Sequence, residues 1–191
     1  MKAQELAERI RAMGAHRAES IKVENIPFDR NFRSMCERNA CGNYGKSWMC
    51  PPDVGDIDML ISRAKGYDTA VVYQTVGLLE DSYDFEGMME AGQRMNELTQ
   101  KIRNTFCDEL PDALFLGAGG CRVCPVCAKR TNEPCRFPQK ALASLETYGV
   151  HVSRLAELCG MNYINGQNTV TYFGAILLHD EKKKGDPDAC Q

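Results

Sequence analysis

Residues 69–76 read TAVVYQTV, a run rich in β-branched side chains. Such a run is typical of a largely buried strand. A longer run of the same kind, TVTYFGAILL, covers residues 169–178, and a shorter apolar run covers residues 113–116. A further short strand is expected around residues 20–26. These segments predict the strands of one sheet.

Amphipathic helices are expected between these strands. The clearest covers residues 85–110, where apolar side chains recur at three- and four-residue steps along one face. Further helices are predicted over residues 1–14, 56–66, 138–149 and 153–159, with Asp56 and Ser153 as N-caps and Gly66 and Gly149 as C-terminal stops. The alternation of helices and strands predicts an α/β or α+β fold, with a mixed sheet of about four or five strands flanked by helices.

The length of 191 residues suits one domain. We expect a single metal-binding domain over residues 1–180 and a charged, disordered tail over residues 181–191. The net charge of −3 provides no general basic field, which argues against nucleic acid as a partner. No segment approaches the ~20 apolar residues of a membrane span, and the N-terminus lacks a signal-peptide pattern. The expected location is the cytoplasm; no pattern predicts an oligomeric state.

The chain contains ten cysteines, and grouped thiols in a reducing cytosol are more often metal ligands than disulfides. The strongest group has three cysteines at successive C-x-x-C steps and a fourth after seven residues: Cys121, Cys124, Cys127 and Cys135. Thiolates at this spacing can wrap around one [4Fe-4S] cluster, as in bacterial ferredoxins. Zinc ribbons use two separated pairs instead, so zinc held by these four residues is the alternative.

A second group lies in the aperiodic stretch CERNACGNYGKSWMCPPD, residues 36–53, and contains Cys36, Cys41 and Cys50. Glycine and proline residues around these thiols suggest another ligand loop, and therefore one or two clusters in all. The two groups supply seven thiols, one short of the eight that two fully ligated cubes need. Cys107 or Cys159 could complete the set, although both also suit buried structural positions. Cys135 could instead serve the N-terminal group, and otherwise one iron stays open.

Two basic residues near the cysteines are candidates for binding a substrate. Lys46 lies between Cys41 and Cys50 and could contact an anion at that site. Arg136 follows Cys135 directly, and it could equally balance the negative charge of a thiolate-bound cluster or dock an acidic redox partner.

The residues around both groups resemble a known family. The features are Cys36, Cys41, the stretch 44–52 (YGKSWMCPP), the stretch 119–127 (GGCRVCPVC) and the stretch 134–138 (PCRFP). They are similar to those of the uncharacterised, cysteine-rich predicted metal-binding proteins of bacteria and archaea. The resemblance spans most of the chain. It implies metal binding, with iron–sulfur chemistry in an anaerobic cytoplasm, and no particular reaction.

Three functions remain as hypotheses. The leading one is an iron–sulfur protein that transfers electrons or acts as a redox accessory subunit, with a redox protein as partner. The second is an enzyme in which a cluster with an open iron, held by Cys36, Cys41 and Cys50, activates a small-molecule substrate. The third is a structural zinc module that supports protein interaction.

Overall fold

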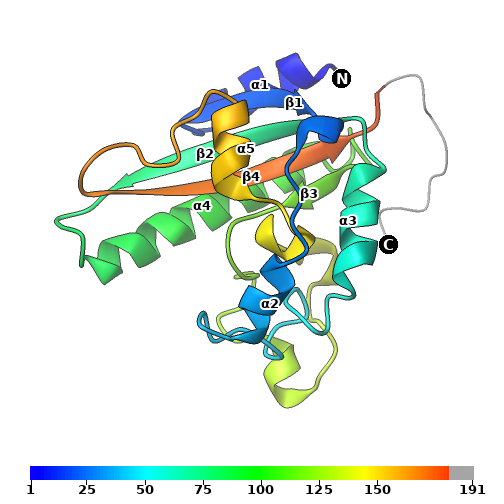
Figure 1. Ribbon diagram of the computed structural model, residues 1–191, viewed down its shortest axis with the longest axis vertical. Coiled ribbons are helices and arrows are strands. Elements are labelled where there is room, and N and C mark those ends of the chain that lie inside the picture. Colours follow the sequence, from blue (N-terminus) through cyan, green and yellow to red (C-terminus); the bar gives the residue numbers. More distant parts are fainter. Residues whose placement is uncertain (181–191) are drawn as a thin grey trace.

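The computed structural model describes residues 1–180 and contains five α-helices and four strands in that range (Figure 1). The expected tail, residues 181–191 with Cys190, lies outside the described residues. The helices are α1 (Ala3–Ala12), α2 (Phe32–Glu37), α3 (Ile57–Lys65), α4 (Phe85–Phe106) and α5 (Val152–Leu158). The strands are β1 (Arg17–Lys22), β2 (Thr69–Leu78), β3 (Leu114–Leu116) and β4 (Thr169–Leu178).

The four strands form one sheet in the order β1-β2-β4-β3. All three neighbouring pairs are antiparallel, and the two long central strands pair over their full length, with Val72 opposite Ala175. The sheet is therefore antiparallel rather than mixed, and the fold is of the α+β class. Two parallel neighbouring strands need a crossover connection that returns the chain to the end of the sheet where the first strand began. The antiparallel pairs of this sheet do not require such a connection.

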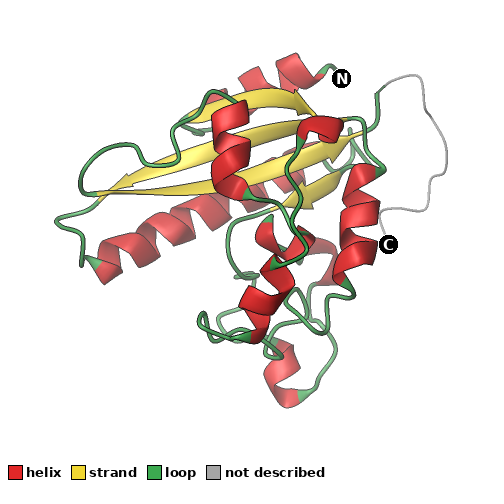
Figure 2. Ribbon diagram, viewed as in Figure 1, coloured by secondary structure: helices red, strands yellow, loops and turns green. Residues whose placement is uncertain are grey.

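Helices cover both faces of the sheet (Figures 1 and 2). On one face, α1 and α4 enclose a core that includes Ile10, Tyr73 and Ile102. On the other face, α3 and α5 enclose a second core that includes Leu60 and Leu155. Side chains alternate between the two faces along a strand, so β2 contributes to both cores. None of the helices in residues 1–180 is long and apolar enough to cross a membrane.

The predicted helix over residues 138–149 is wrong. The chain forms two short 3₁₀ turns there, Pro138–Lys140 and Glu146–Tyr148, with an extended piece between them. Backbone hydrogen bonds run from Gly117 N–H to the Ala143 oxygen and from Leu145 N–H to the Gly117 oxygen. The extended piece thus pairs with Gly117, the residue directly after β3, at the edge of the sheet. These hydrogen bonds replace those that a helix would have made.

The sheet and its helices form the upper part of the molecule in Figure 1, and the long loops gather below it. Two segments meet there: residues 28–55 with the short helix α2, and residues 117–137 with the 3₁₀ helix Ala128–Thr131. These loops carry seven of the chain's ten cysteines.

Candidate metal centre

The N-terminal thiol group, defined as Cys36, Cys41 and Cys50, is held by a loop of successive tight turns. Cys36 lies on α2, Cys41 is exposed, and Cys50 is only 8% exposed. Gly45 adopts a φ of +66°, and its N–H donates to the Pro51 oxygen at 2.8 Å. Glycine adopts this left-handed conformation without strain, which allows the loop to fold back on itself. This turn brings residues 45 and 51 together, and Cys50 between them is buried.

The three thiols of this group lie close enough to influence one another. Burial is the main cause that raises the pKa of Cys36 and of Cys50, and Cys41 adds to both shifts through its own negative charge. A neutral thiol is therefore favoured until a metal is bound, because a buried thiolate needs a positive partner.

The C-terminal thiol group, defined as Cys121, Cys124, Cys127 and Cys135, surrounds one small cavity. Apolar atoms form most of the remaining cavity wall, with Phe137 and Ala141 among them. The chain enters this group directly from β3 through the turn at residues 117–120. The structure thus places Cys135 with the three cysteines of the C-x-x-C run rather than with the N-terminal group.

Hydrogen-bond donors lie near the sulfur atoms of Cys121 and Cys127. Burial raises the pKa of Cys121, while backbone N–H groups of Val123 and Leu142 partly oppose the shift. At Cys127 burial acts in the same direction, but donors outweigh it and lower the pKa. The donors to Cys127 are the backbone N–H groups of Lys129 and Trp48 and the Ser47 hydroxyl, and the Arg136 charge assists them. Such donors stabilise a thiolate, the form that binds metal.

The two thiol groups are neighbours. The Ser47 hydroxyl interacts with Cys50 of one group and with Cys127 of the other. A Cβ atom added at Gly120 would lie 3.8 Å from the Cys50 sulfur and 3.3 Å from Nδ2 of Asn43. The turn at Gly120 therefore lies within van der Waals range of the N-terminal loop. Two sites built from these groups would share a wall.

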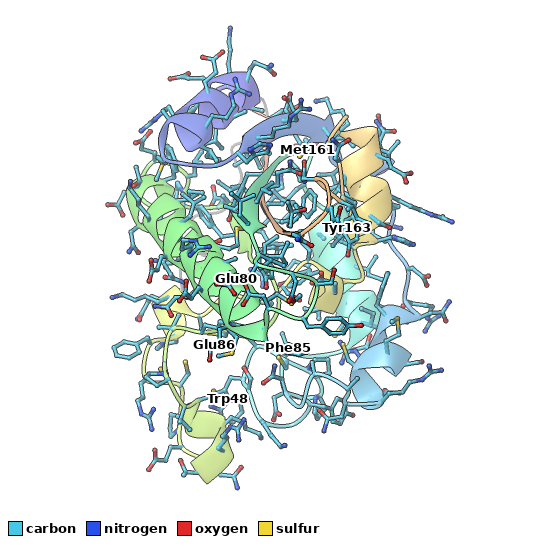
Figure 3. All side chains as sticks on the ribbon, turned by 90° about the vertical axis from the view of Figure 1, so that its left-hand side faces the viewer. Trp48, Glu80, Phe85, Glu86, Met161 and Tyr163 are labelled. Carbon is cyan, nitrogen blue, oxygen red and sulfur yellow. The ribbon has the colours of Figure 1, made fainter. Side chains whose placement is uncertain are left out.

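A set of polar contacts, here called the loop clasp, ties the two loops together. Lys129 Nζ lies 2.5 Å from Oδ1 of Asp53, and the side chains of this ion pair are only 18% and 16% exposed. The same ammonium group lies 4.4 Å from the ring centroid of Trp48. Trp48 in turn donates from Nε1 to the Glu133 oxygen at 3.0 Å. Figure 3 shows Trp48 in the lower part of the molecule, near the 3₁₀ helix that carries Lys129.

Two further cysteines that the sequence offered as ligands lie elsewhere. Cys107 is the C-cap of α4, with its sulfur 3.7 Å from Oδ1 of Asp108. Cys159 is the C-cap of α5 and packs against the core of that face. Burial raises the pKa of Cys159 to about 11, with the Glu19 carboxylate as the further cause. The structure brings neither thiol into the two groups.

The two basic candidates differ in position. Arg136 lines the cavity of the C-terminal group and donates from Nη1 to the Val126 oxygen at 3.0 Å, which closes the loop around the thiols. Lys46 is exposed, and its backbone N–H donates to the Asn43 oxygen. Arg136 therefore belongs to the thiol group itself, whereas Lys46 lies on the outer surface of the N-terminal loop.

Sequence reasoning missed Ser47 and Asp53. Both lie inside the N-terminal loop but act on the C-terminal one, through Cys127 and Lys129. Pattern and spacing carry no signal for contacts between loops about 80 residues apart. The only hint in the sequence was that Asp53 lies three residues after Cys50, close to a candidate ligand.

The described residues, 1–180, contain no group of three histidine, cysteine, aspartate or glutamate side chains positioned to hold a single metal ion.

A family model described as "Predicted metal-binding protein (DUF2284)" matches residues 19–178 of the chain. The chain belongs to this family. The matched range contains both thiol groups and the whole sheet except the first residues of β1. No curated protein and no solved structure matches the chain. The family description, together with the two adjoining thiol groups, makes this a cysteine-rich metal-binding protein.

Proposed function

We propose that the protein is an iron–sulfur protein that transfers electrons, with one [4Fe-4S] cluster in the C-terminal thiol group and a second in the N-terminal group. The observation that carries the proposal is the cavity enclosed by Cys121, Cys124, Cys127 and Cys135. Four thiolates are the usual ligand set of such a cluster, and its iron atoms supply one-electron redox chemistry.

The sequence spacing of the thiols favours a cluster over zinc, because three cysteines at successive C-x-x-C steps are typical of ferredoxin-type clusters. Four thiolates on one zinc ion lie about 3.8 Å apart, because each Zn–S bond is ~2.3 Å long and the geometry is tetrahedral. In a cube the iron–sulfide core lies between the thiolates and holds them farther apart.

The residues around the sulfur atoms suit a redox site. Backbone N–H groups donate to Cys121 and Cys127, and Arg136 contributes positive charge beside Cys127. Hydrogen bonds to the sulfur ligands and nearby positive charge stabilise the reduced, more negative cluster and raise its potential. Because Ser47 contacts thiols of both groups, an electron would have only a short distance to travel between them.

A second candidate function arises from the ligand count of the N-terminal group. That group offers three thiols, and Cys107 and Cys159 lie in other parts of the fold. A [4Fe-4S] cluster held by three thiolates keeps one iron free for a small-molecule substrate, for which it would act as a Lewis acid. The alternative function is therefore an enzyme with its reaction centre at Cys36, Cys41 and Cys50.

The test is an absorption and EPR study of anaerobically purified protein. The proposal expects a brown protein that bleaches with dithionite, gives the EPR signal of a reduced cluster and regains its colour on reoxidation. A colourless protein that contains stoichiometric zinc and no acid-labile sulfide would overturn it. To separate the two functions, the reduced protein is titrated with cyanide as a ligand for an open iron. A shift of one EPR signal would favour the enzyme, and unchanged signals would favour electron transfer.

A further inference from the structure

A cavity of about 360 Å³ lies next to the thiol groups and takes no part in them. The cavity lies alongside β3. Its wall consists of residues 138–143, the C-terminal end of α4, α3 and part of the loop that carries Trp48. Gln100 of α4 donates to the Lys140 oxygen at 2.9 Å and so fixes one wall against another. Pockets that hold small molecules span ~300–1,000 Å³, so this cavity is large enough for a compact ligand.

Two arginines give the cavity its charge. Arg63 reaches it from α3 and Arg103 from α4. Among residues 1–180 the only carboxylate in the cavity wall is Asp53, and it is already paired with Lys129. The ion pairs found in the described part of the chain include neither arginine. The two arginines therefore border the cavity without an ion-pair partner among residues 1–180.

Two tyrosines lie near Arg63. Burial raises the pKa of Tyr148 and that of Tyr67, and the Arg63 guanidinium opposes both shifts by charge and by hydrogen bonding. Arg63 therefore lies beside the phenol groups of Tyr67 and Tyr148, and Tyr148 also lines the cavity.

Apolar side chains form a large part of the remaining wall, beside polar ones such as Gln139. Leu60, Leu114, Leu116 and Leu142 contribute aliphatic surface, and Trp48 and Tyr148 contribute aromatic surface. A wall of this kind suits the body of an organic molecule better than it suits a bare inorganic ion, because apolar surface gains free energy when it is removed from water.

We propose that this cavity binds a small organic anion, whose carboxylate or phosphate group is held by Arg63 and Arg103 and whose apolar body lies against Leu114 and Leu142. The arginine fork matches both oxyanions, with two parallel N–H···O bonds to each. The inference concerns the cavity alone and holds whichever metal the thiols bind.

The test is isothermal titration calorimetry of the metal-loaded protein with four probes. Benzoate and phenyl phosphate carry both an anionic group and an apolar body, benzyl alcohol carries only the body, and inorganic phosphate carries only the charge. We expect saturable binding of benzoate, phenyl phosphate or both, tighter than either control probe. Saturable binding of neither anion, or equal binding of benzyl alcohol, would overturn the proposal.

Variants locate the binding within the cavity. Arg63→Met and Arg103→Met should each weaken binding about tenfold or more, the loss of one charge-assisted fork. Arg154→Met is the matched control, because Arg154 is exposed on α5 and does not line the cavity. Equal affinity in all variants would contradict the assignment. Metal content measured on the same samples shows whether the thiol groups are intact, so a failure of this inference is distinguishable from a failure of the iron–sulfur proposal.

Discussion

The sheet with its covering helices and the two cysteine loops are built on different principles. The sheet buries apolar side chains on both faces, and its two central strands pair over ten residues each. The loops have short helices and turns, and although Phe28 and Val54 pack against one core of the sheet, the contacts between the two loops are polar or involve sulfur. The sheet therefore has a hydrophobic core of its own, whereas the loops depend on the clasp and on metal to hold their thiols.

This difference separates folding from metal binding. A mutation in the sheet should reduce the free energy of unfolding of the whole domain and leave ligand chemistry unchanged. A mutation in the loops should change metal content and leave the sheet folded, because the thiol groups lie outside both cores. Three substitutions, from the largest expected effect to the smallest, test this separation.

Gly174→Val should have the largest effect on folding. A Cβ at Gly174 would lie 2.5 Å from Cζ of Tyr73 on the neighbouring strand, and Tyr73 is only 1% exposed. Neither the strand nor the buried ring can move aside without disturbing the core, so we expect a loss of about 3 kcal/mol in urea denaturation followed by circular dichroism. The same substitution made in a Tyr73→Leu background should cost less. A variant as stable as wild type would mean that the ring is free to move.

Cys121→Ser should remove metal from the C-terminal group and keep the sheet. A serine hydroxyl is a poor ligand for iron, and the remaining three thiols should lose the cluster or hold it weakly. We expect about half of the wild-type iron, with an unchanged far-ultraviolet circular dichroism spectrum. Cys159→Ser is the matched control and should retain full iron, since Cys159 packs against the sheet. Wild-type iron in Cys121→Ser, or a loss in Cys159→Ser, would contradict the ligand assignment.

Lys129→Met should loosen the loop clasp. The substitution leaves the Asp53 carboxylate largely buried without its countercharge, which we expect to cost about 2 kcal/mol in thermal unfolding of the loops. The cost should shrink in an Asp53→Asn background, where no charge is left unpaired. Lys46→Met is the control, because Lys46 is exposed, and it should change stability by less than about 0.5 kcal/mol. Equal effects of the two lysine substitutions would show that the clasp contributes nothing.

Much of the fold was predictable because the sheet and its helices are periodic. The strand over residues 169–178 was predicted at its observed bounds, and Asp56 caps α3 as expected, accepting from the N–H groups of Asp58 and Met59. The helix over residues 138–149 was not, since its apolar spacing also fits an extended segment that pairs beyond β3. The local sequence pattern also could not show that all the strands are antiparallel rather than mixed. The direction of a strand depends on the path of the connection that leads to it.

The candidate site was predictable in composition but not in arrangement. Spacing alone brought Cys121, Cys124 and Cys127 together, because successive C-x-x-C steps wrap locally. The location of Cys135 and the separation of Cys107 from both groups follow from tertiary packing, which no spacing rule contains. Ser47 illustrates the same limit, as its contacts with two thiol groups exist only once both loops have folded.

The most direct test of the central claim, that two adjacent thiol groups each hold a cluster, is a count of iron and acid-labile sulfide after anaerobic reconstitution. The account predicts about eight of each per chain in the wild-type protein, since each cube holds four. It predicts about four of each when Cys36, Cys41 and Cys50 are replaced together by serine. Iron and sulfide near four per chain in both proteins would contradict the N-terminal site, and zinc without sulfide would contradict both.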